Sequence, residues 1–180
     1  GFLGGEPVPA VMRYGYGYLQ GIDDAAAALG IADSVEVEYV YGGLFYGDDI
    51  VTEVMDTWYG TMGVEVVFAC GGRIYTSAAE AAARAQGKVI GVDSDQQFVI
   101  DSAYGQDMTI TSAMKGLSPT INSVLTGIRD GNWDNFAGKI ENLGIVTDIA
   151  EENYVQLPIR TTQWTSSFKE KDYRALVKEL

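Results

Sequence analysis

The sequence predicts an α/β fold in which a parallel sheet is flanked by helices. Short apolar runs alternate with segments of helical spacing, and this unit recurs at intervals of about thirty residues. Such spacing favours right-handed crossovers, and therefore parallel strands with helices on both faces of the sheet. In addition, each of the first four apolar runs ends in glycine or aspartate, as expected where a strand turns into a helix.

The first half of the chain alternates strand and helix. Residues 1–3 are apolar and end at a pair of glycines, and residues 10–29 repeat apolar side chains at helical spacing before Gly30, a typical C-terminal stop. Residues 35–41 alternate apolar with acidic side chains, as a strand with one polar face does. A helix is then predicted at residues 50–59, because a preceding aspartate can cap its N-terminus.

The centre of the chain predicts the buried part of the sheet. Residues 64–70 form a continuous apolar run, which is typical of a strand buried on both faces. An alanine-rich helix follows, with Thr76 or Ser77 as its cap and Gly87 as its end. Residues 88–92 are the next short apolar strand.

The pattern is weaker beyond residue 98. Residues 108–113 are predicted to form a strand, and a Ser-Pro pair predicts the start of a helix over residues 118–128. Residues 139–149 alternate irregularly, and residues 169–180 predict a charged C-terminal helix.

Composition and charge exclude several classes of function. The 180 residues carry 12 Lys and Arg against 25 Asp and Glu, a net charge of −13, which argues against binding to nucleic acid or an anionic membrane. The absence of histidine excludes Ser-His-Asp and Cys-His catalysis within this chain and His-ligated zinc. A single cysteine, Cys70, excludes an intrachain disulfide and a Cys-rich metal site. We therefore expect a binding protein, not an enzyme, with no cofactor and no metal.

Glycine is unusually common and is concentrated at the predicted strand ends. There are 22 glycines in 180 residues, against a usual share of about 7%. Ligands of open α/β sheets bind outside the carboxyl ends of the strands, where helix N-termini offer free N–H groups. A single glycine pair is explained by a tight turn alone, but four strand ends in register favour a site.

Two carboxylates and one lysine are candidate ligand-binding groups. Asp93 and Asp95 follow the strand at 88–92, where they either accept hydrogen bonds from sugar hydroxyls or cap a helix. Lys115 directly follows an apolar strand and is either a site residue or an ordinary surface lysine.

Aromatic residues at the same edge give a second kind of candidate. Phe45 and Tyr46 follow the glycine pair after residues 35–41, and they either stack on a flat ligand or pack on the next helix. The segment GYGYLQG at residues 15–21 is not a dinucleotide loop, because it lies within a helical pattern and its third glycine is misplaced.

Four blocks of sequence resemble the basic-membrane-protein family of ABC-transporter substrate-binding lipoproteins, which includes purine-nucleoside receptors. The blocks are FLGG with RYGYGYLQG, VEVVFACGG, KVIGVDSDQ and TITSAMKG, and they cover residues 1–130 in order. The resemblance implies the second lobe of a periplasmic-binding-protein type I fold. It also implies that the chain is part of a longer protein, with residues 1–112 as the ligand-binding lobe and residues 113–180 as crossover segments, in which helix 119–130 packs on the first lobe.

The resemblance assigns roles to the candidate residues. Phe45, or Tyr46 if the register differs by one residue, would stack on the purine, and Gly71 would contribute to ribose recognition. Asp93 would accept the ribose hydroxyls, and Lys115 would bind on the ribose side. Arg73 departs from the family pattern, because a small residue is usual there, and the pocket is then narrower or differently charged.

The implied function is that of a solute receptor that delivers a nucleoside to an ABC permease. The receptor would be extracytoplasmic and lipid-anchored through an N-terminal region outside this chain, and half of the clamp is expected to bind nucleosides weakly or not at all. The same fold also serves as the sensing domain of signalling or transcriptional regulators, which is the alternative. An enzyme that uses Asp93 or Asp95 is disfavoured, because the chain has no histidine and no paired nucleophile and base.

Overall fold

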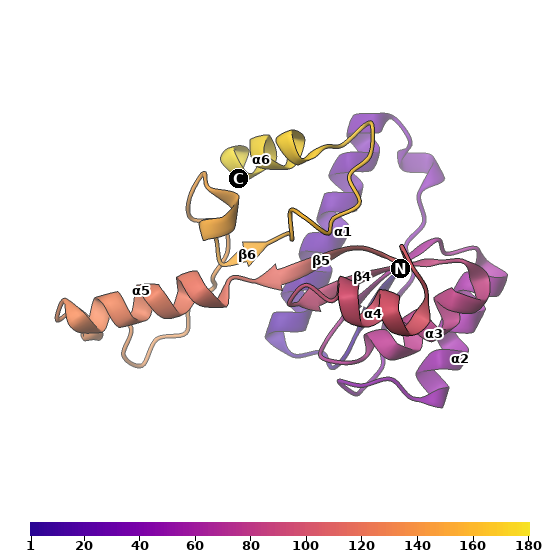
Figure 1. The fold of residues 1–180 in the computed structure, drawn as a ribbon, viewed down its shortest axis with the longest axis horizontal. Helices are drawn as coiled ribbons and strands as arrows, with labels where there is room; N and C mark the ends of the chain where they lie inside the picture. The colour runs from indigo at the N-terminus through magenta and orange to yellow at the C-terminus, as the bar shows by residue number, and fades with distance from the viewer.

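The computed structural model describes residues 1–180 and contains one six-stranded sheet with six α-helices around it (Figure 1). The strands are β1 Phe2–Gly4, β2 Tyr39–Tyr41, β3 Val66–Cys70, β4 Lys88–Asp93, β5 Thr109–Lys115 and β6 Val155–Gln156. The helices are α1 Pro9–Leu29, α2 Asp49–Thr57, α3 Tyr75–Ala85, α4 Gln97–Tyr104, α5 Leu117–Arg129 and α6 Glu170–Glu179.

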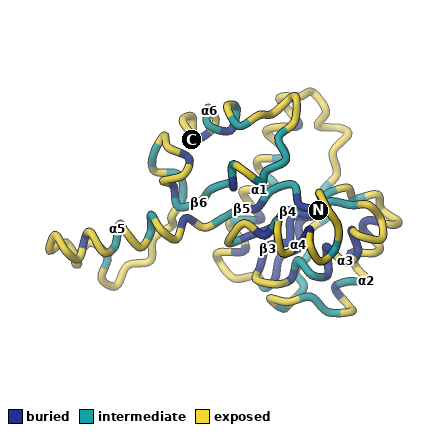
Figure 2. The backbone as a smooth tube through the Cα atoms, viewed as in Figure 1, coloured by how far each residue is buried: buried dark blue, intermediate teal, exposed yellow.

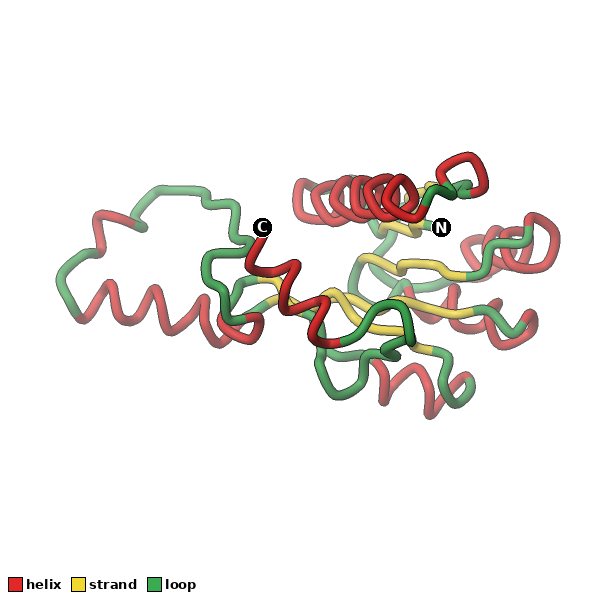
Figure 3. Tube along the Cα trace, turned by 90° about the horizontal axis from the view of Figure 1, so that it is seen from above, coloured by secondary structure: helices red, strands yellow, loops and turns green.

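The sheet has the strand order β2-β1-β3-β4-β5-β6. Strands β1 to β5 are parallel, and only β6 pairs antiparallel, with β5. Figure 3 shows the strands as a layer between helices. The α/β fold with a parallel sheet flanked by helices is therefore confirmed.

The two faces of the sheet are covered unequally. Alternate strand residues such as Leu3 and Val67 pack with α2, α3 and α4 in a core of fifteen buried residues. The intervening residues, such as Phe2 and Phe68, pack with α1 in a second core of five buried residues. Three helices thus cover one face of the sheet, and α1 alone covers the other.

Phe2 is the centre of the core beneath α1. Its side chain is fully buried, and its ring stacks on Tyr39 with 4.5 Å between ring centroids. The ring of Phe68 meets it edge-on at 5.5 Å, and the ring of Tyr18, on α1, lies 6.4 Å away. These contacts join β1, β2, β3 and α1, so Phe2 fixes how α1 sits on the sheet.

The chain beyond β5 leaves the body of the molecule. Helix α5 projects away from the sheet, and Figure 2 shows most of it exposed. Its apolar side chains Ile121, Leu125 and Ile128 are 55%, 58% and 48% exposed. None of the helices combines the length and the apolar content needed to span a membrane.

The C-terminal segment then returns to the sheet. The N–H of Gln163 donates to the carbonyl oxygen of Ile110 at 2.8 Å, and the hydroxyls of Thr162 and Thr111 are hydrogen-bonded at 2.7 Å. Helix α6 follows, and its Tyr173 and Val177 pack with Ala150 in a third, small cluster. The chain also leaves the sheet after Lys115 and comes back at Val155, which pairs with Lys115, so two stretches of chain run side by side at the end of β5.

Most predicted elements are confirmed, but the sequence pattern does not predict helix α4 or strand β6. Helix α4 was not predicted, because its pattern is the reverse of an amphipathic surface helix: Phe98 and Val99 are exposed while Asp101 is buried. Asp101 is buried because it accepts the N–H of Thr109 at 2.9 Å and that of Asp107 at 3.1 Å. The irregular segment at residues 139–149 forms no strand, and strand β6, which lies just after it, was not foreseen.

Candidate functional site

The carboxyl ends of the parallel strands meet at one edge of the sheet. Gly4 at the end of β1 is paired with Cys70 at the end of β3, and Asp93 at the end of β4 is paired with Met114 in β5. The register therefore places Gly71, Asp93 and Lys115 on three successive strand ends, as the sequence predicts.

Asp93 and Lys115 form an ion pair at this edge. Lys115 Nζ lies 2.8 Å from Asp93 Oδ1, and the two side chains are 45% and 42% exposed. An ion pair this exposed contributes little to stability, on the order of 0–1 kcal/mol. Its consequence is geometric, because the lysine holds the carboxylate in one orientation and leaves its other oxygen open to solvent donors.

Phe45 lies directly on two glycine turns. A Cβ at Gly5 would be 2.6 Å from Phe45 Cδ1, and one at Gly71 would be 3.0 Å from the same atom. Gly71 also has φ of 146°, a conformation that other residues rarely adopt. The ring is 39% exposed, so it rests on the backbone with one side and presents the other to solvent.

Tyr46 lies one residue further along and has a different environment. It is 56% exposed, and its backbone pairs with Arg73, whose N–H donates to the carbonyl oxygen of Phe45 at 2.7 Å. Of the two aromatic residues, Phe45 is the one that contacts the glycine turns.

Asp95 already has partners for both carboxylate oxygens. The N–H of Gln97 donates to Oδ1 at 3.1 Å, at the start of α4, and Thr161 Oγ1 donates to Oδ2 at 2.6 Å. Both oxygens of Asp95 are therefore used within the chain, one of them by an N–H in the first turn of α4. The residues that the strand ends bring together are Phe45, Gly71, Asp93 and Lys115.

Sequence reasoning missed Gln96, which is buried under this edge. It forms hydrogen bonds with Gly72 in the turn after β3, with Val92 of β4 and with Ser112 of β5. Gln96 is the last residue of the GVDSDQ block. The sequence does not show that it is buried, because a polar amide next to two aspartates is expected at the surface.

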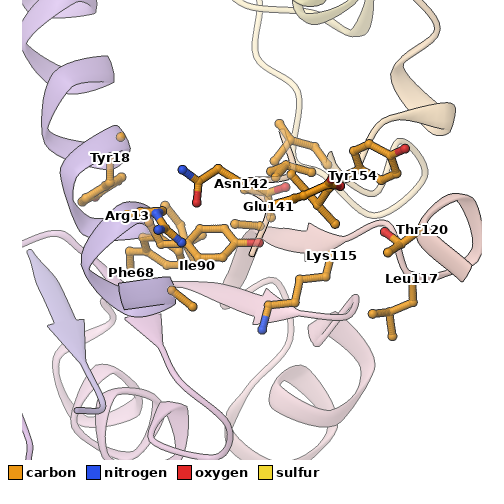
Figure 4. Close-up of a pocket in the computed structure, with 18 residues that line it drawn as sticks. Arg13, Tyr18, Phe68, Ile90, Lys115, Leu117, Thr120, Glu141, Asn142 and Tyr154 are labelled. Carbon is orange, nitrogen blue, oxygen red and sulfur yellow. The ribbon is translucent and has the colours of Figure 1, made fainter. Parts of the chain in front are cut away.

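A cavity of about 630 Å³ lies on the α1 side of the sheet, where a single helix leaves the strands partly uncovered (Figure 4). Figure 4 shows Arg13 and Tyr18 of α1 on one side and Glu141, Asn142 and Tyr154 of the segment after α5 on the other. Lys115 belongs to its lining, so the cavity adjoins the strand-end site.

Tyr14 faces the same region from α1. Its hydroxyl is buried without a hydrogen-bond partner, and burial, aided by the negative charge of Asp93, raises the pKa of Tyr14 to about 12. The phenol therefore stays neutral over the physiological pH range.

Cys70 is the buried small hydrophobic residue that the sequence predicts. It is 1% exposed, and burial, with a smaller contribution from the charge of Asp93, raises its pKa to about 12. Very little of the reactive thiolate is therefore present at about pH 8.

We therefore expect folded Cys70 to react at least about 100-fold more slowly with a disulfide reagent such as DTNB than the urea-unfolded chain does at the same pH. Absorbance at the wavelength of the released thiolate measures both rates. Complete labelling of the folded chain at the unfolded rate would contradict the burial and the raised pKa.

Comparison with known proteins gives a family and a fold. Residues 1–175 match the model of the Bmp family, described as "ABC transporter substrate-binding protein PnrA-like". A solute-binding protein of an ABC transporter system from Aeropyrum pernix K1 superposes with a TM-score of 0.61 at 21% sequence identity, over 99% of this chain and 48% of that one.

A second solute-binding protein, from Conexibacter woesei DSM 14684, superposes with a TM-score of 0.57 at 21% identity, over 99% of this chain and 51% of that one. The chain thus spans about half the length of these relatives, and at this identity the likeness shows the fold alone. No curated protein matches the chain in sequence.

Proposed function

The chain belongs to the Bmp family of PnrA-like ABC transporter substrate-binding proteins, and from this premise we propose that it supplies one lobe of a receptor that binds a nucleoside for import. The observation that carries the proposal is the pairing of Asp93 with Lys115 beside the ring of Phe45, all at the carboxyl edge of one parallel sheet. The receptor binds its ligand without transforming it and works outside the cytoplasmic membrane, lipid-anchored through a region upstream of this chain.

The chemistry of the edge suits the two halves of a nucleoside. The second oxygen of Asp93 accepts hydrogen bonds from ribose hydroxyls, while Lys115 is paired with the first. The open face of Phe45 offers a stacking plane for the base, while Gly71 lets the ligand approach the backbone closely.

We further propose that residues 1–112 are the second lobe and that residues 113–180 cross between two lobes. Helix α5 supports this division, because it begins just after β5 and turns apolar side chains to solvent instead of to the sheet. In the two-lobed protein these side chains, with Leu117 at 62% exposure, would pack on the first lobe.

The test is isothermal titration calorimetry of the full-length protein with adenosine, guanosine and inosine, and with ribose and amino acids as other ligand classes. We expect purine nucleosides to bind in the micromolar range or tighter, and the isolated 180-residue chain to bind them at least about 100-fold more weakly, because one lobe buries half of the ligand. Binding of amino acids without binding of nucleosides would refute the nucleoside proposal. Micromolar binding of nucleosides by the isolated chain would refute the two-lobed clamp.

Two single variants decide which aromatic residue stacks. Phe45→Ala is expected to weaken nucleoside binding about tenfold or more, since stacking on a base is worth about 1–3 kcal/mol, and to leave ribose binding almost unchanged. Tyr46→Ala is the matched control and is expected to bind within about twofold of the wild type, because Tyr46 does not contact the glycine turns. If Tyr46→Ala weakens nucleoside binding and Phe45→Ala does not, Tyr46 is the residue that stacks on the base.

A further inference from the structure

Gln96 connects the turn after β3, the end of β4 and the middle of β5. Its side-chain Oε1 accepts the N–H of Val92 at 2.9 Å, and its Nε2 donates to the carbonyl oxygen of Gly72 at 3.3 Å. Its own backbone N–H donates to Ser112 Oγ at 3.1 Å. The amide of one buried side chain therefore joins the turn after β3 to the end of β4, while its backbone holds β5.

Gly91 makes room for this side chain. A Cβ at Gly91 would lie 2.8 Å from Gln96 Oε1 and 2.9 Å from Gln96 Cβ. The glutamine is thus packed closely against the backbone of β4, and its Oε1 and Nε2 both form hydrogen bonds.

The two chain segments that Gln96 joins are the ones that carry the site. Val92 directly precedes Asp93, which holds the left-handed backbone conformation at φ 70° although it is not glycine. Gly72 follows Gly71, on which Phe45 rests, and has φ of 53°. The conformation of Asp93 is unusual for a residue other than glycine and persists only where the surroundings fix it, whereas Gly72 adopts its angle without strain.

We propose that Gln96 is a positioning residue that sets the separation between the carboxylate of Asp93 and the stacking platform formed by Phe45 and Gly71. This proposal rests on the nucleoside-binding function proposed above. Gln96 touches no ligand: its Nε2 holds the glycine turn and its Oε1 holds the end of β4, so the ribose and base subsites keep a constant spacing.

The variant Gln96→Glu separates positioning from packing, because it has almost the same shape. As a carboxylate, the new side chain still accepts the N–H of Val92 but faces the carbonyl oxygen of Gly72 without a proton to donate. When protonated, it donates again. The charged groups around it are Asp93 and Asp95 of the same turn, Arg73 of the neighbouring turn and Lys115 of β5, and the wild type measured at both pH values corrects for their titration.

We expect the Gln96→Glu protein to bind inosine about tenfold or more weakly than the wild type at about pH 7.5, and to recover to within about threefold of it at about pH 5. Without ligand, the ¹⁵N resonance of Arg73, whose peptide contains the Gly72 carbonyl, is expected to shift at the higher pH and to return at the lower one. Wild-type affinity at about pH 7.5 would overturn the proposal, as would lost affinity that persists after the Arg73 resonance has returned.

Two further measurements keep the proposal testable. If the wild type binds no nucleoside, the nucleoside function fails, and the Arg73 and Asp93 resonances alone decide whether Gln96 positions the two turns. If the Gln96→Glu protein does not fold, Gly91→Ala replaces it and is expected to displace the amide and cause a similar loss of affinity. Gly21→Ala, at a helix position where nothing lies within 4 Å, is the matched control and is expected to bind like the wild type.

Discussion

Replacing Asp93 with alanine in the full-length protein is expected to raise the dissociation constant for a purine nucleoside about 100-fold or more. Hydrogen bonds to a charged group contribute about 1.5–3 kcal/mol each, and two ribose hydroxyls on one carboxylate correspond to at least about 3 kcal/mol. The variant also leaves Lys115 without its partner at 2.8 Å. Calorimetric titration with inosine measures the change.

Asp95→Ala is the matched control, since it removes the same group two residues away. Asp95 is bound to Gln97 and Thr161, so the variant is expected to lower the melting temperature slightly and to keep the affinity within about threefold. An equal loss of affinity in both variants would mean that the whole turn, and not the Asp93 carboxylate, accounts for binding.

Phe2→Ala is expected to destabilise the fold by about 3–5 kcal/mol, which for a chain of this size corresponds to a fall of roughly 10 °C in melting temperature. The reason is the loss of a fully buried ring that contacts β2, β3 and α1 at once. Urea unfolding followed by circular dichroism gives the free energy of unfolding.

Tyr16→Ala tests whether burial accounts for this loss. Tyr16 belongs to α1 but is 70% exposed, so its removal is expected to change the free energy of unfolding by less than about 0.5 kcal/mol. If Phe2→Ala were equally mild, the core beneath α1 would not hold the helix in place.

The sequence predicts the parallel part of the sheet well, because buried parallel strands are continuous apolar runs that end in glycine or aspartate. Prediction from the sequence is wrong where polar side chains are buried. Asp101 reverses the apparent pattern of α4 because backbone N–H groups surround it, and a single sequence does not show such partners.

In the candidate site, the positions of residues are predictable from the sequence, but their side-chain contacts are not. The strand-end positions of Asp93 and Lys115 are predictable, because the ends of parallel strands must meet at one edge of the sheet. Their 2.8 Å ion pair, the engagement of Asp95 by Thr161 and the burial of Gln96 depend on side-chain directions that arise only when distant segments pack.

The two stretches of chain that run side by side at the end of β5 have a mechanical consequence for the proposed clamp. If these two stretches connect the lobes of the proposed clamp, the lobes rotate about a line near the end of β5. Lys115 lies close to that axis, whereas Phe45 rests on the turns after β3 and β1, two and three strands away, roughly 10–14 Å at the usual strand spacing. Closure would therefore move the ring of Phe45 farther than the Asp93–Lys115 pair, so the base subsite would change more on closure than the ribose subsite.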